Sequence, residues 1–441
     1  MSAPHNNTTH TPRASAMRRF RRNSPARLSL YIVAALALIA ILAPVLANDR
    51  PLYAEYKGHR LFPAFTFKNN YYLQMADGDY ERIQPDIADW KQMQLDNVIW
   101  APVPYAPDKT DRLNSAYVSP AGKQLFRDAE GQVVDMPARF RHRLGTNSLG
   151  EDVLAGLIHG TRISLSIGCI AMVIAALIGL LLGSVAGYFG DERLVSTRGR
   201  ALCTMPGIFF GWFYGWQARQ IILRDALAGN GYFAVEALIS ICIFAGIVLL
   251  FSFAGKFAGR LPWLNKQISI PADSLISRTI EILHSLPTFI LILTIAAIAR
   301  PSLVHVMVII GLTNWTGIAR LVRAELLRVR ELEYVQAARS MGFSEWKIIV
   351  HHALPNSIAP ALVSIAFGIA SAILTESSLS FLGIGVPSDT VTWGSLVNDG
   401  RQQFSAWWLV VFPGLAIFLT VTLYNLIGEG LRDALDPKLQ K

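Results

Sequence analysis

Charged residues are scarce in this sequence of 441 residues: Asp, Glu, Lys and Arg together make up 16% of it, against 52% hydrophobic residues. A water-soluble enzyme of this length normally carries far more charge, so the composition predicts a protein of the lipid bilayer. The net charge of +9 would suit nucleic acid if it covered one soluble domain. The basic residues instead lie in short stretches beside apolar runs, which indicates membrane lipid, and no nucleic acid, as the expected partner.

Cysteine is also nearly absent, and the three that occur lie in apolar stretches without metal-ligand or CxxC spacing: Cys169, Cys203 and Cys242. His351 and His352 are adjacent, so both imidazoles cannot lie on one helix face. The sequence contains no GxxxxGK[ST] phosphate-binding loop, no HExxH and no nucleophile elbow. We therefore expect no metal site, no cofactor and no catalytic residues, and any ATP must be bound by another polypeptide.

The N-terminal residues 1–27 carry six arginines and no acidic residue, and residues 28–47 are apolar over about the thickness of a bilayer. This pattern predicts a basic cytoplasmic tail followed by a first transmembrane helix that leads outward. A cleaved signal peptide is the alternative, because Val45-Leu46-Ala47 resembles a peptidase site. The apolar run is long for a signal peptide, which favours the membrane anchor.

Residues 48–143 are polar and contain no apolar run able to cross a membrane. We expect an external, periplasmic domain here. Aromatic side chains give it apolar material that a disordered tether lacks, so the segment is predicted to be folded: Phe65, Phe67, Tyr71, Tyr72, Trp90 and Trp100.

Residues 144–190 contain the second span, Ile163–Tyr188, in which small residues recur at every fourth position: Ala171, Ala175, Gly179, Gly183 and Gly187. This spacing lets another helix backbone approach closely, so helix packing is their expected role. Residues 191–272 follow as an inserted region. Within it, 233–254 is a convincing span, whereas 201–222 is interrupted by Pro206 and Arg219, which leaves its membrane status open.

Residues 273–430 contain the remaining spans. Ser274–Ser285 is amphipathic and leads into a span from Pro287 to about Ala299. Further spans are expected at 303–319, 357–375 and 407–427, with an external loop at 377–406 and a cytoplasmic tail at 431–441. Arginines directly after the first of these spans place the loop 320–355 in the cytoplasm: Arg320, Arg323, Arg328 and Arg330. The predicted fold class is an all-α polytopic membrane protein.

The cytoplasmic loop 320–355 is the most informative stretch. Glu331–Ser340 favours a helix, Gly342 can take the left-handed conformation that ends one, Ser344 can cap the next and Pro355 can close it. Ala337 and Ala338 would leave a shallow surface on which a partner could sit close to the backbone. A plain connector between two spans is the alternative, but it would not need this length or punctuation.

Part of this loop, QAARSMGFSEWKIIVHHALP, resembles the EAA loop of the permeases of binding-protein-dependent ABC importers. Five residues match the pattern: Ala337, Ala338, Gly342, Leu354 and Pro355. Gln336 stands in place of the acidic residue and His352 in place of the isoleucine. The resemblance implies an ATPase-coupling element, to which we also assign Glu333 and Arg339.

Three further stretches narrow the resemblance to the dipeptide, oligopeptide and nickel permeases, and to the second, C-type permease: LGTNSLGEDVLAGLIHGTRISLSIG, ILTESSLSFLGIGVPSDTVTWGSLVNDG and PGLAIFLTVTLYNLIGEGLRDALDPKL. The long external segment is similar to the branch that contains the microcin C and oligopeptide permeases. The family resemblance implies a type I ABC importer permease core in the bacterial inner membrane, with both termini in the cytoplasm.

The expected partners follow from the same resemblance: a second homologous permease, two ATP-binding cassette subunits and a periplasmic or lipid-anchored solute-binding protein. Because the inserted region would begin and end in the cytoplasm, 201–222 and 233–254 should form a transmembrane hairpin, giving eight spans instead of six.

The cargo is expected to be peptides or peptide-like compounds; nickel or another small solute is the alternative. A polytopic membrane enzyme and a passive channel are further alternatives. Polar residues within the membrane are candidate functional residues, although hydrogen bonding between helices would also explain them: Asn314, Glu376 and Asn425.

Overall fold

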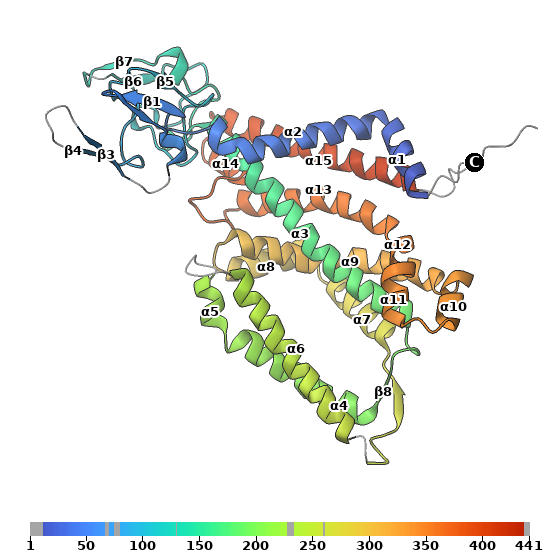
Figure 1. Ribbon diagram of the computed structural model, residues 1–441. Helices are drawn as coiled ribbons and strands as arrows, with labels where there is room; N and C mark the ends of the chain where they lie inside the picture. The colour runs from blue at the N-terminus through green and yellow to red at the C-terminus, as the bar shows by residue number, and fades with distance from the viewer. Residues whose placement is uncertain are drawn as a thin grey trace, which may run out of the picture. The chain divides into compact units, whose positions relative to one another are not determined.

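The computed structural model describes residues 12–66, 70–74, 80–128, 130–226, 233–258 and 261–435, and Figure 1 shows its helices and strands. The chain divides into two compact units. The first comprises Met1–Gly183, Glu281–Val322 and Ala338–Lys441, and the second comprises Ser184–Ile280 and Arg323–Ala337.

A helical bundle forms most of the first unit. Helices α1 (Pro12–Arg22) and α2 (Ser24–Leu46) pack along α15 (Trp408–Leu435), which also packs against α13 (Ala359–Phe381) and the short α14 (Trp393–Arg401) (Figure 1). The core of this bundle includes Leu165, Ile373, Trp393 and Tyr424, and Leu36 of α2 packs against it. Because α2 belongs to the core, the structure favours a permanent membrane anchor over a cleaved signal peptide.

Helices α3 (Val153–Phe189) and α9 (Leu303–Val329) approach each other at backbone distance. In the first unit, a Cβ atom added to Gly179 or Gly183 would lie 2.9 or 2.6 Å from a backbone carbonyl oxygen of α9. In the second unit, a Cβ on Gly187 would lie 2.6 Å from another such oxygen. Any larger side chain at these three positions would push the two helices apart.

Residues 48–143 fold into a small module built from short antiparallel strands. A three-stranded sheet has the order β2 (His59–Leu61), β1 (Tyr53–Tyr56) and β5 (Val98–Ile99). Two two-stranded sheets pair β3 (Tyr71–Gln74) with β4 (Tyr80–Ile83) and β6 (Leu125–Arg127) with β7 (Val133–Asp135). Its core contains Leu61, Leu73, Ile83, Trp90 and Trp100.

The aromatic residues expected in that core are divided between core and surface. Trp90 and Trp100 are buried and Tyr71 packs against them, whereas Phe65 and Tyr72 are exposed. Phe67 lies outside the described residues. The buried aromatics are sufficient to give module 48–143 an apolar core of its own.

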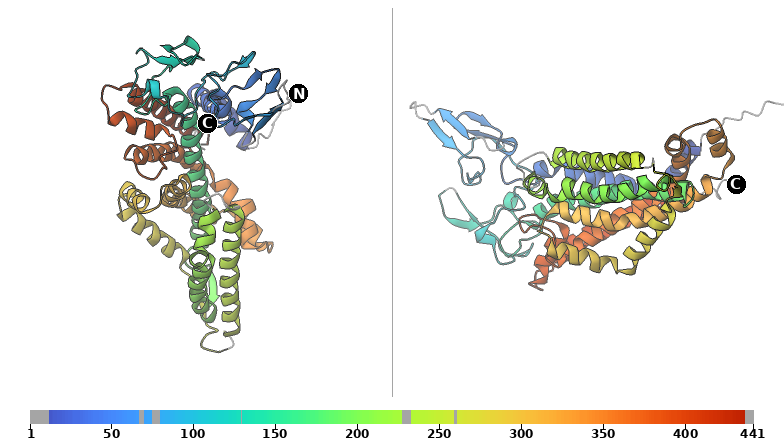
Figure 2. Two further views of the ribbon diagram at one scale, coloured as in Figure 1. Left: turned by 90° about the vertical axis from the view of Figure 1, so that its left-hand side faces the viewer. Right: turned by 90° about the horizontal axis from the view of Figure 1, so that it is seen from below.

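The inserted region forms a helical hairpin in the second unit. Helix α4 (Arg198–Trp212) continues through a π-helical turn into α5 (Gln220–Asp225), and α4 lies beside α6 (Phe233–Ala258) in both Figure 1 and Figure 2. A Cβ on Gly207 would lie 2.6 Å from the Cβ of Phe251. Glycine therefore permits this close packing of the two helices.

The two ends of the hairpin lie side by side. Strand β8 (Val195–Thr197) enters it and pairs in antiparallel fashion with β9 (Gln267–Ser269), which leaves it. A segment that leaves and returns at one place must cross a membrane an even number of times. This geometry supports the predicted hairpin, whose tip, including Asn230, lies outside the described residues.

The described residues contain six helices that are long and apolar enough to cross a membrane, or seven if α7 (Ala272–Ser285) and α8 (Thr288–Ile298) form one broken span. These two helices meet at an angle of 81°. Helix α8 has 11 residues and a length of about 16 Å, well short of the hydrocarbon core of about 30 Å. Helix α8 would therefore cross only together with part of α7, and both the span expected at 287–299 and the count of eight spans stay predictions.

Candidate functional site

The candidate site is the loop that leaves α9. Helix α9 ends at Val329, ten residues beyond the expected end of its span, so the arginine-rich start of the loop is helical. Three short helices follow: α10 (Glu333–Ser340), α11 (Glu345–Ile348) and α12 (Leu354–Ser357). The expected arrangement of helix, turn and helix is thus present.

The turn between α10 and α11 depends on Gly342, whose φ angle is +80°. A side chain is strained in this left-handed conformation, whereas glycine adopts it freely. No atom lies within 4 Å of the position that a Cβ would occupy, so the surrounding space is open. Its amide donates to the carbonyl oxygen of Arg339 at 2.9 Å, and the amide of Phe343 donates to that of Ala338 at 3.3 Å, which closes the end of α10.

An ion pair joins the two helices across this turn. The Arg339 guanidinium meets the Glu345 carboxylate at Nε–Oε1 and Nη2–Oε2 distances of 3.1 and 3.3 Å. Arg339 lies in the last turn of α10 and Glu345 in the first turn of α11, so each charge also suits the dipole of its own helix. The turn and the ion pair together hold the two helices in one arrangement.

The two alanines of the motif differ in exposure. Ala337 is exposed, but Ala338 is buried, with 3% of its surface accessible. The expectation that both leave a shallow surface for a partner therefore holds for Ala337 only. A bulky substitution at Ala338 would disturb the chain's own packing, and it cannot serve as a test of docking.

Large apolar side chains are exposed on the loop, which the sequence reading did not predict. We call Met341, Phe343, Trp346 and Val350 the apolar ridge; their exposed fractions are 67%, 37%, 53% and 53%. The run MGFSEW, with three large apolar residues in a loop expected to lie in water, was the sequence signal for it. Trp346 and Val350 lie four residues apart in a continuous helical segment and so share one face. Exposed apolar side chains gathered on one face are typical of a protein-docking surface.

The second half of the loop differs from the expectation at two residues. Ser344 stands at the start of α11 but its side chain makes no capping hydrogen bond. Pro355 does not close the helix: a π-helical turn at Ile349–Ala353 precedes it, and α12 continues to Ser357. Proline fits here because it lies in the first turn of α12, where its missing N–H is not needed. Leu354 and Pro355 are both half-buried.

The start of the loop is tied to neighbouring elements of the second unit. Arg323 near the end of α9 pairs with Asp273 in the first turn of α7 through both nitrogens of its guanidinium edge. Arg330 donates to the carbonyl oxygen of Gly187 at 3.4 Å, and Glu331 pairs with Arg193 at 3.1 Å. On α10, Gln336 donates to the Glu331 carbonyl oxygen at 3.1 Å, and Glu333 is exposed in its first turn. A displacement of residues 323–337 would therefore also move the ends of α3 and α7 that belong to the same unit.

Two of the three candidate polar residues within the expected spans, Glu376 and Asn314, make local hydrogen bonds. Glu376 is fully buried and accepts hydrogen bonds from Ser380 at 2.7 Å and from Ser164 at 3.4 Å. Asn314 donates to the Ile310 carbonyl oxygen within its own helix at 2.8 Å. In the part of the chain that the structure describes, no three His, Cys, Asp or Glu side chains form a group that could hold a metal ion.

Two family profiles match the sequence. The profile described as "Binding-protein-dependent transport system inner membrane component" matches residues 252–441, which include the whole loop. The profile described as "N-terminal TM domain of oligopeptide transport permease C" matches residues 11–63, which include α2.

Curated relatives match over most of the chain. The dipeptide transport system permease protein DppC of Alkalihalophilus pseudofirmus is 31% identical over 300 residues, 68% of this chain and 73% of the relative. The inner membrane ABC transporter permease protein YejE of Escherichia coli is 27% identical over 424 residues, 95% of each chain. The peptidoglycan transport system permease protein YejE of Agrobacterium fabrum is 26% identical over 434 residues, 95% of this chain and 91% of the relative.

Proposed function

The chain belongs to the family of binding-protein-dependent transport system inner membrane components, and from this premise we propose that it is a permease subunit of an ATP-driven peptide importer. As a member of that family, it is a multi-pass inner-membrane protein and is not itself an enzyme. Relatives named for dipeptide and peptidoglycan transport support peptide-containing cargo over nickel. Both termini would lie in the cytoplasm.

The apolar ridge is the observation that carries this proposal. It lies next to a turn that is fixed by Gly342 and by the Arg339–Glu345 pair. A partner would therefore bind a surface whose conformation is already set before binding. We assign Leu332–Lys347 as the coupling element, docked in a cleft of an ATP-binding cassette subunit. A second homologous permease would complete the path, with one ATPase subunit on each permease.

Transport needs the ATPase to favour one conformation of the permease pair over the other, since a partner with equal affinity for both states shifts nothing. The ion pair of Arg323 with Asp273 connects the start of the loop to α7, and the hydrogen bond from Arg330 to the Gly187 carbonyl oxygen connects it to α3. Through these contacts, movement of the ATPase would move the membrane helices.

Module 48–143 would lie outside the membrane and contact the solute-binding protein or the mouth of the paired permease. Its own apolar core supports this role, because a folded surface can be recognised. In spheroplasts an added protease should cleave it slowly and only at exposed loops. Rapid cleavage throughout the module would contradict its folding, and cleavage only after permeabilisation would contradict its location.

The docking role can be tested in proteoliposomes that contain the chain, its homologous permease and both ATPase subunits. Trp346→Ser removes an exposed apolar side chain from the ridge and should strongly reduce ATPase recruitment and peptide uptake. Phe404→Ser is the matched control, because Phe404 is 93% exposed on the loop between α14 and α15. Wild-type recruitment by the Trp346 variant, or equal loss in the control, would contradict the assignment.

A further inference from the structure

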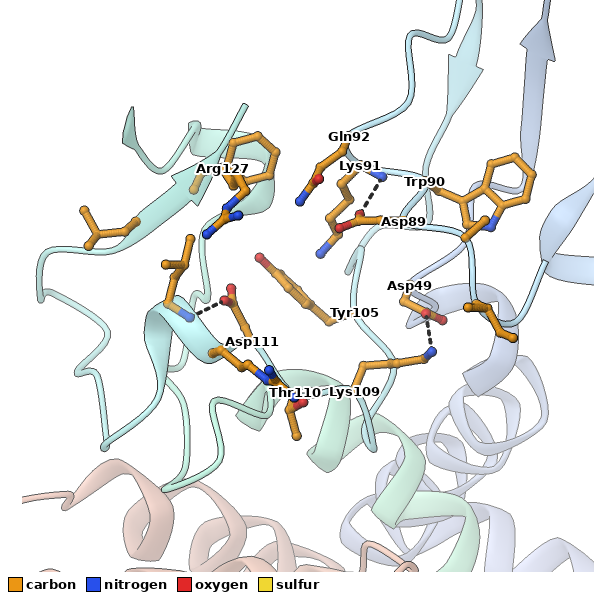
Figure 3. Close-up of a pocket in the computed structure, with 16 residues that line it drawn as sticks. Asp49, Asp89, Trp90, Lys91, Gln92, Tyr105, Lys109, Thr110, Asp111 and Arg127 are labelled. Atoms are coloured by element: carbon orange, nitrogen blue, oxygen red, sulfur yellow. Dashed lines mark hydrogen bonds and ion pairs between the residues drawn. The ribbon is translucent and has the colours of Figure 1, made fainter. Parts of the chain in front are cut away.

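Module 48–143 contains a cavity, open to solvent, with a volume of about 530 Å³, shown in Figure 3. Asp49 and residues from three segments line it: residues 87–92, residues 105–113 and strand β6. The volume lies within the range of pockets that bind small molecules. The cavity lies apart from the coupling element and is not explained by that element's role.

Lys91 faces this cavity and has no carboxylate within ion-pair distance, although the charges of nearby carboxylates act on it: Asp111, Asp49, Asp152 and Asp89. Its ammonium nitrogen lies 3.3 Å from the centre of the Tyr105 ring, and within the described part of the chain it makes no ion pair and no side-chain hydrogen bond. Burial lowers the pKa of Lys91 to about 8. A charge held in this way is costly, and a bound anion would offset much of that cost.

Arg127 is the second cation without a partner. In Figure 3 its guanidinium and the Lys91 amine point into the same space from different sides. Arg127 is exposed, and among the residues described no carboxylate pairs with it. Guanidinium and ammonium groups are the usual partners of a carboxylate, the former often through two parallel hydrogen bonds.

The carboxylates of the cavity wall are already engaged. Asp111 accepts from the amide of Asn114 at 2.7 Å and contacts the His142 ring at 3.3 Å. Asp49 pairs with Lys109 at 3.6 Å. Asp89 accepts from the backbone amide of residue 91 at 3.2 Å. These bonds leave the carboxylate charges in place, but the cavity wall carries four basic side chains against these three acidic ones, which leaves one positive charge in excess: Lys91, Lys109, Arg112 and Arg127.

We propose that this cavity binds the terminal carboxylate of a peptide, with Lys91 and Arg127 as its charge partners. Leu113, Leu125 and Phe126 provide apolar wall for the preceding side chain of the peptide. A recessed amine suits a chain end that can enter the cavity better than it suits a flat protein surface. Calling the ligand a peptide rests on the proposed function, whereas the carboxylate site rests on the cavity and its charges alone.

Calorimetry on the purified full-length chain can test this site with two probes that differ only at the C-terminus: N-acetyl-trialanine and its C-terminal amide. The free acid should bind at least about tenfold more tightly than the amide, since a hydrogen bond to a charged group would be lost. Lys91→Met, which keeps the apolar stem, and Arg127→Gln, at an exposed position, should each remove this preference.

Lys123→Gln is the matched control, because Lys123 is exposed in the same module and pairs with Asp135 at 3.2 Å outside the cavity. It should bind like the wild type. Equal binding of acid and amide would overturn the proposal. If neither probe bound to the chain, the proposal would also be overturned. This holds even if the chain were found to bind the solute-binding protein.

The site and the proposed function can fail separately. A wild-type complex that imports peptides although the chain shows no preference for the acid would refute the carboxylate site and leave the permease role intact. A chain that prefers the acid in a complex that imports no peptide would support the site and refute peptide import.

Discussion

Arg339 at the end of α10 pairs with Glu345 at the start of α11, across the turn at Gly342. Both side chains are partly exposed, so the pair should contribute no more than about 1 kcal/mol to folding. Its value lies in holding two helices of the coupling element at a fixed angle. Loss of the pair should therefore impair coupling much more than stability.

Arg339→Glu is expected to leave the abundance of the chain unchanged and to reduce peptide uptake per ATP hydrolysed several-fold, because two carboxylates would repel each other across the turn. The charge swap Arg339→Glu with Glu345→Arg should restore most of the coupling. Proteoliposome assays that follow uptake and phosphate release together give this ratio. Failure of the swap to recover any coupling would show that the pair does not act through its charge.

The hairpin at 191–272 predicts that its tip lies outside the membrane. A chain with Cys169, Cys203 and Cys242 replaced by alanine and a new cysteine at Asn230 should react with a membrane-impermeant maleimide in spheroplasts. A cysteine at Lys57 in module 48–143 is the positive control, and one at Met341 should react only after permeabilisation. If the cysteine at position 230 behaved like the one at position 341, the eight-span topology would be wrong.

Much of the membrane architecture could be predicted from the sequence, because apolar length and helical spacing depend on local residues. The α3 glycines are an example: their spacing indicates a packing face, and the structure places that face against α9. Pro287 likewise indicates the break before α8, whereas the angle of 81° at which α7 and α8 meet does not follow from local residues. Pro355 was read as a stop signal, but the π-helical turn before it accommodates the ring.

The candidate site could be predicted only in part, because its surface depends on contacts between residues distant in sequence. The motif identifies the loop. Which face of the eight-residue helix α10 is buried depends on neighbours that are distant in sequence. The exposure of Ala337 and the burial of Ala338 therefore could not be predicted from the sequence. The Lys91 cavity could not be predicted from the sequence at all. It needs three segments of module 48–143 to converge, and none of them carries a recognisable motif.

His142 predicts a pH dependence of stability. Its ring is fully buried and contacts Asp152 at 2.8 Å and Asp111 at 3.3 Å. Burial alone would lower the pKa of His142, but the hydrogen bonds and charges of these two carboxylates raise it above 6.5. Burial would likewise raise the pKa of Asp111, but its bonds with His142 and Asn114 lower it below 3.8.

The sign of each contribution follows from these shifts. The His142 contribution is fully present below the unfolded pKa of 6.5 and is lost as the pH rises through the folded value. The Asp111 contribution is present above 3.8 and is lost as the pH falls through its lower folded value. Stabilisation by the cluster should thus be greatest between these two pH values.

His142→Gln should therefore lower the melting temperature of the full-length chain most between pH 4 and 6.5 and less in alkaline buffer. Loss of a buried charge partner costs about 3–5 kcal/mol. His59→Gln is the control, because His59 lies in the same module and contacts a backbone oxygen at 3.0 Å instead of a carboxylate. A difference between wild type and His142→Gln that stayed constant from pH 5 to pH 9 would contradict protonation of the ring.

The central claim, that Leu332–Lys347 couples the ATPase to transport, is tested most directly at Gly342. Gly342→Val forces a β-branched residue into a left-handed backbone, at a cost of about 1–2 kcal/mol, without meeting any neighbouring atom. Gly58→Val is the matched control, since Gly58 has a φ of +81° and equally open surroundings in module 48–143. In the reconstituted importer, both variants should be present at equal abundance, and only Gly342→Val should lose ATPase recruitment and ATP-driven uptake. Uptake at the wild-type rate by an equally abundant Gly342→Val permease would contradict the coupling role of this loop.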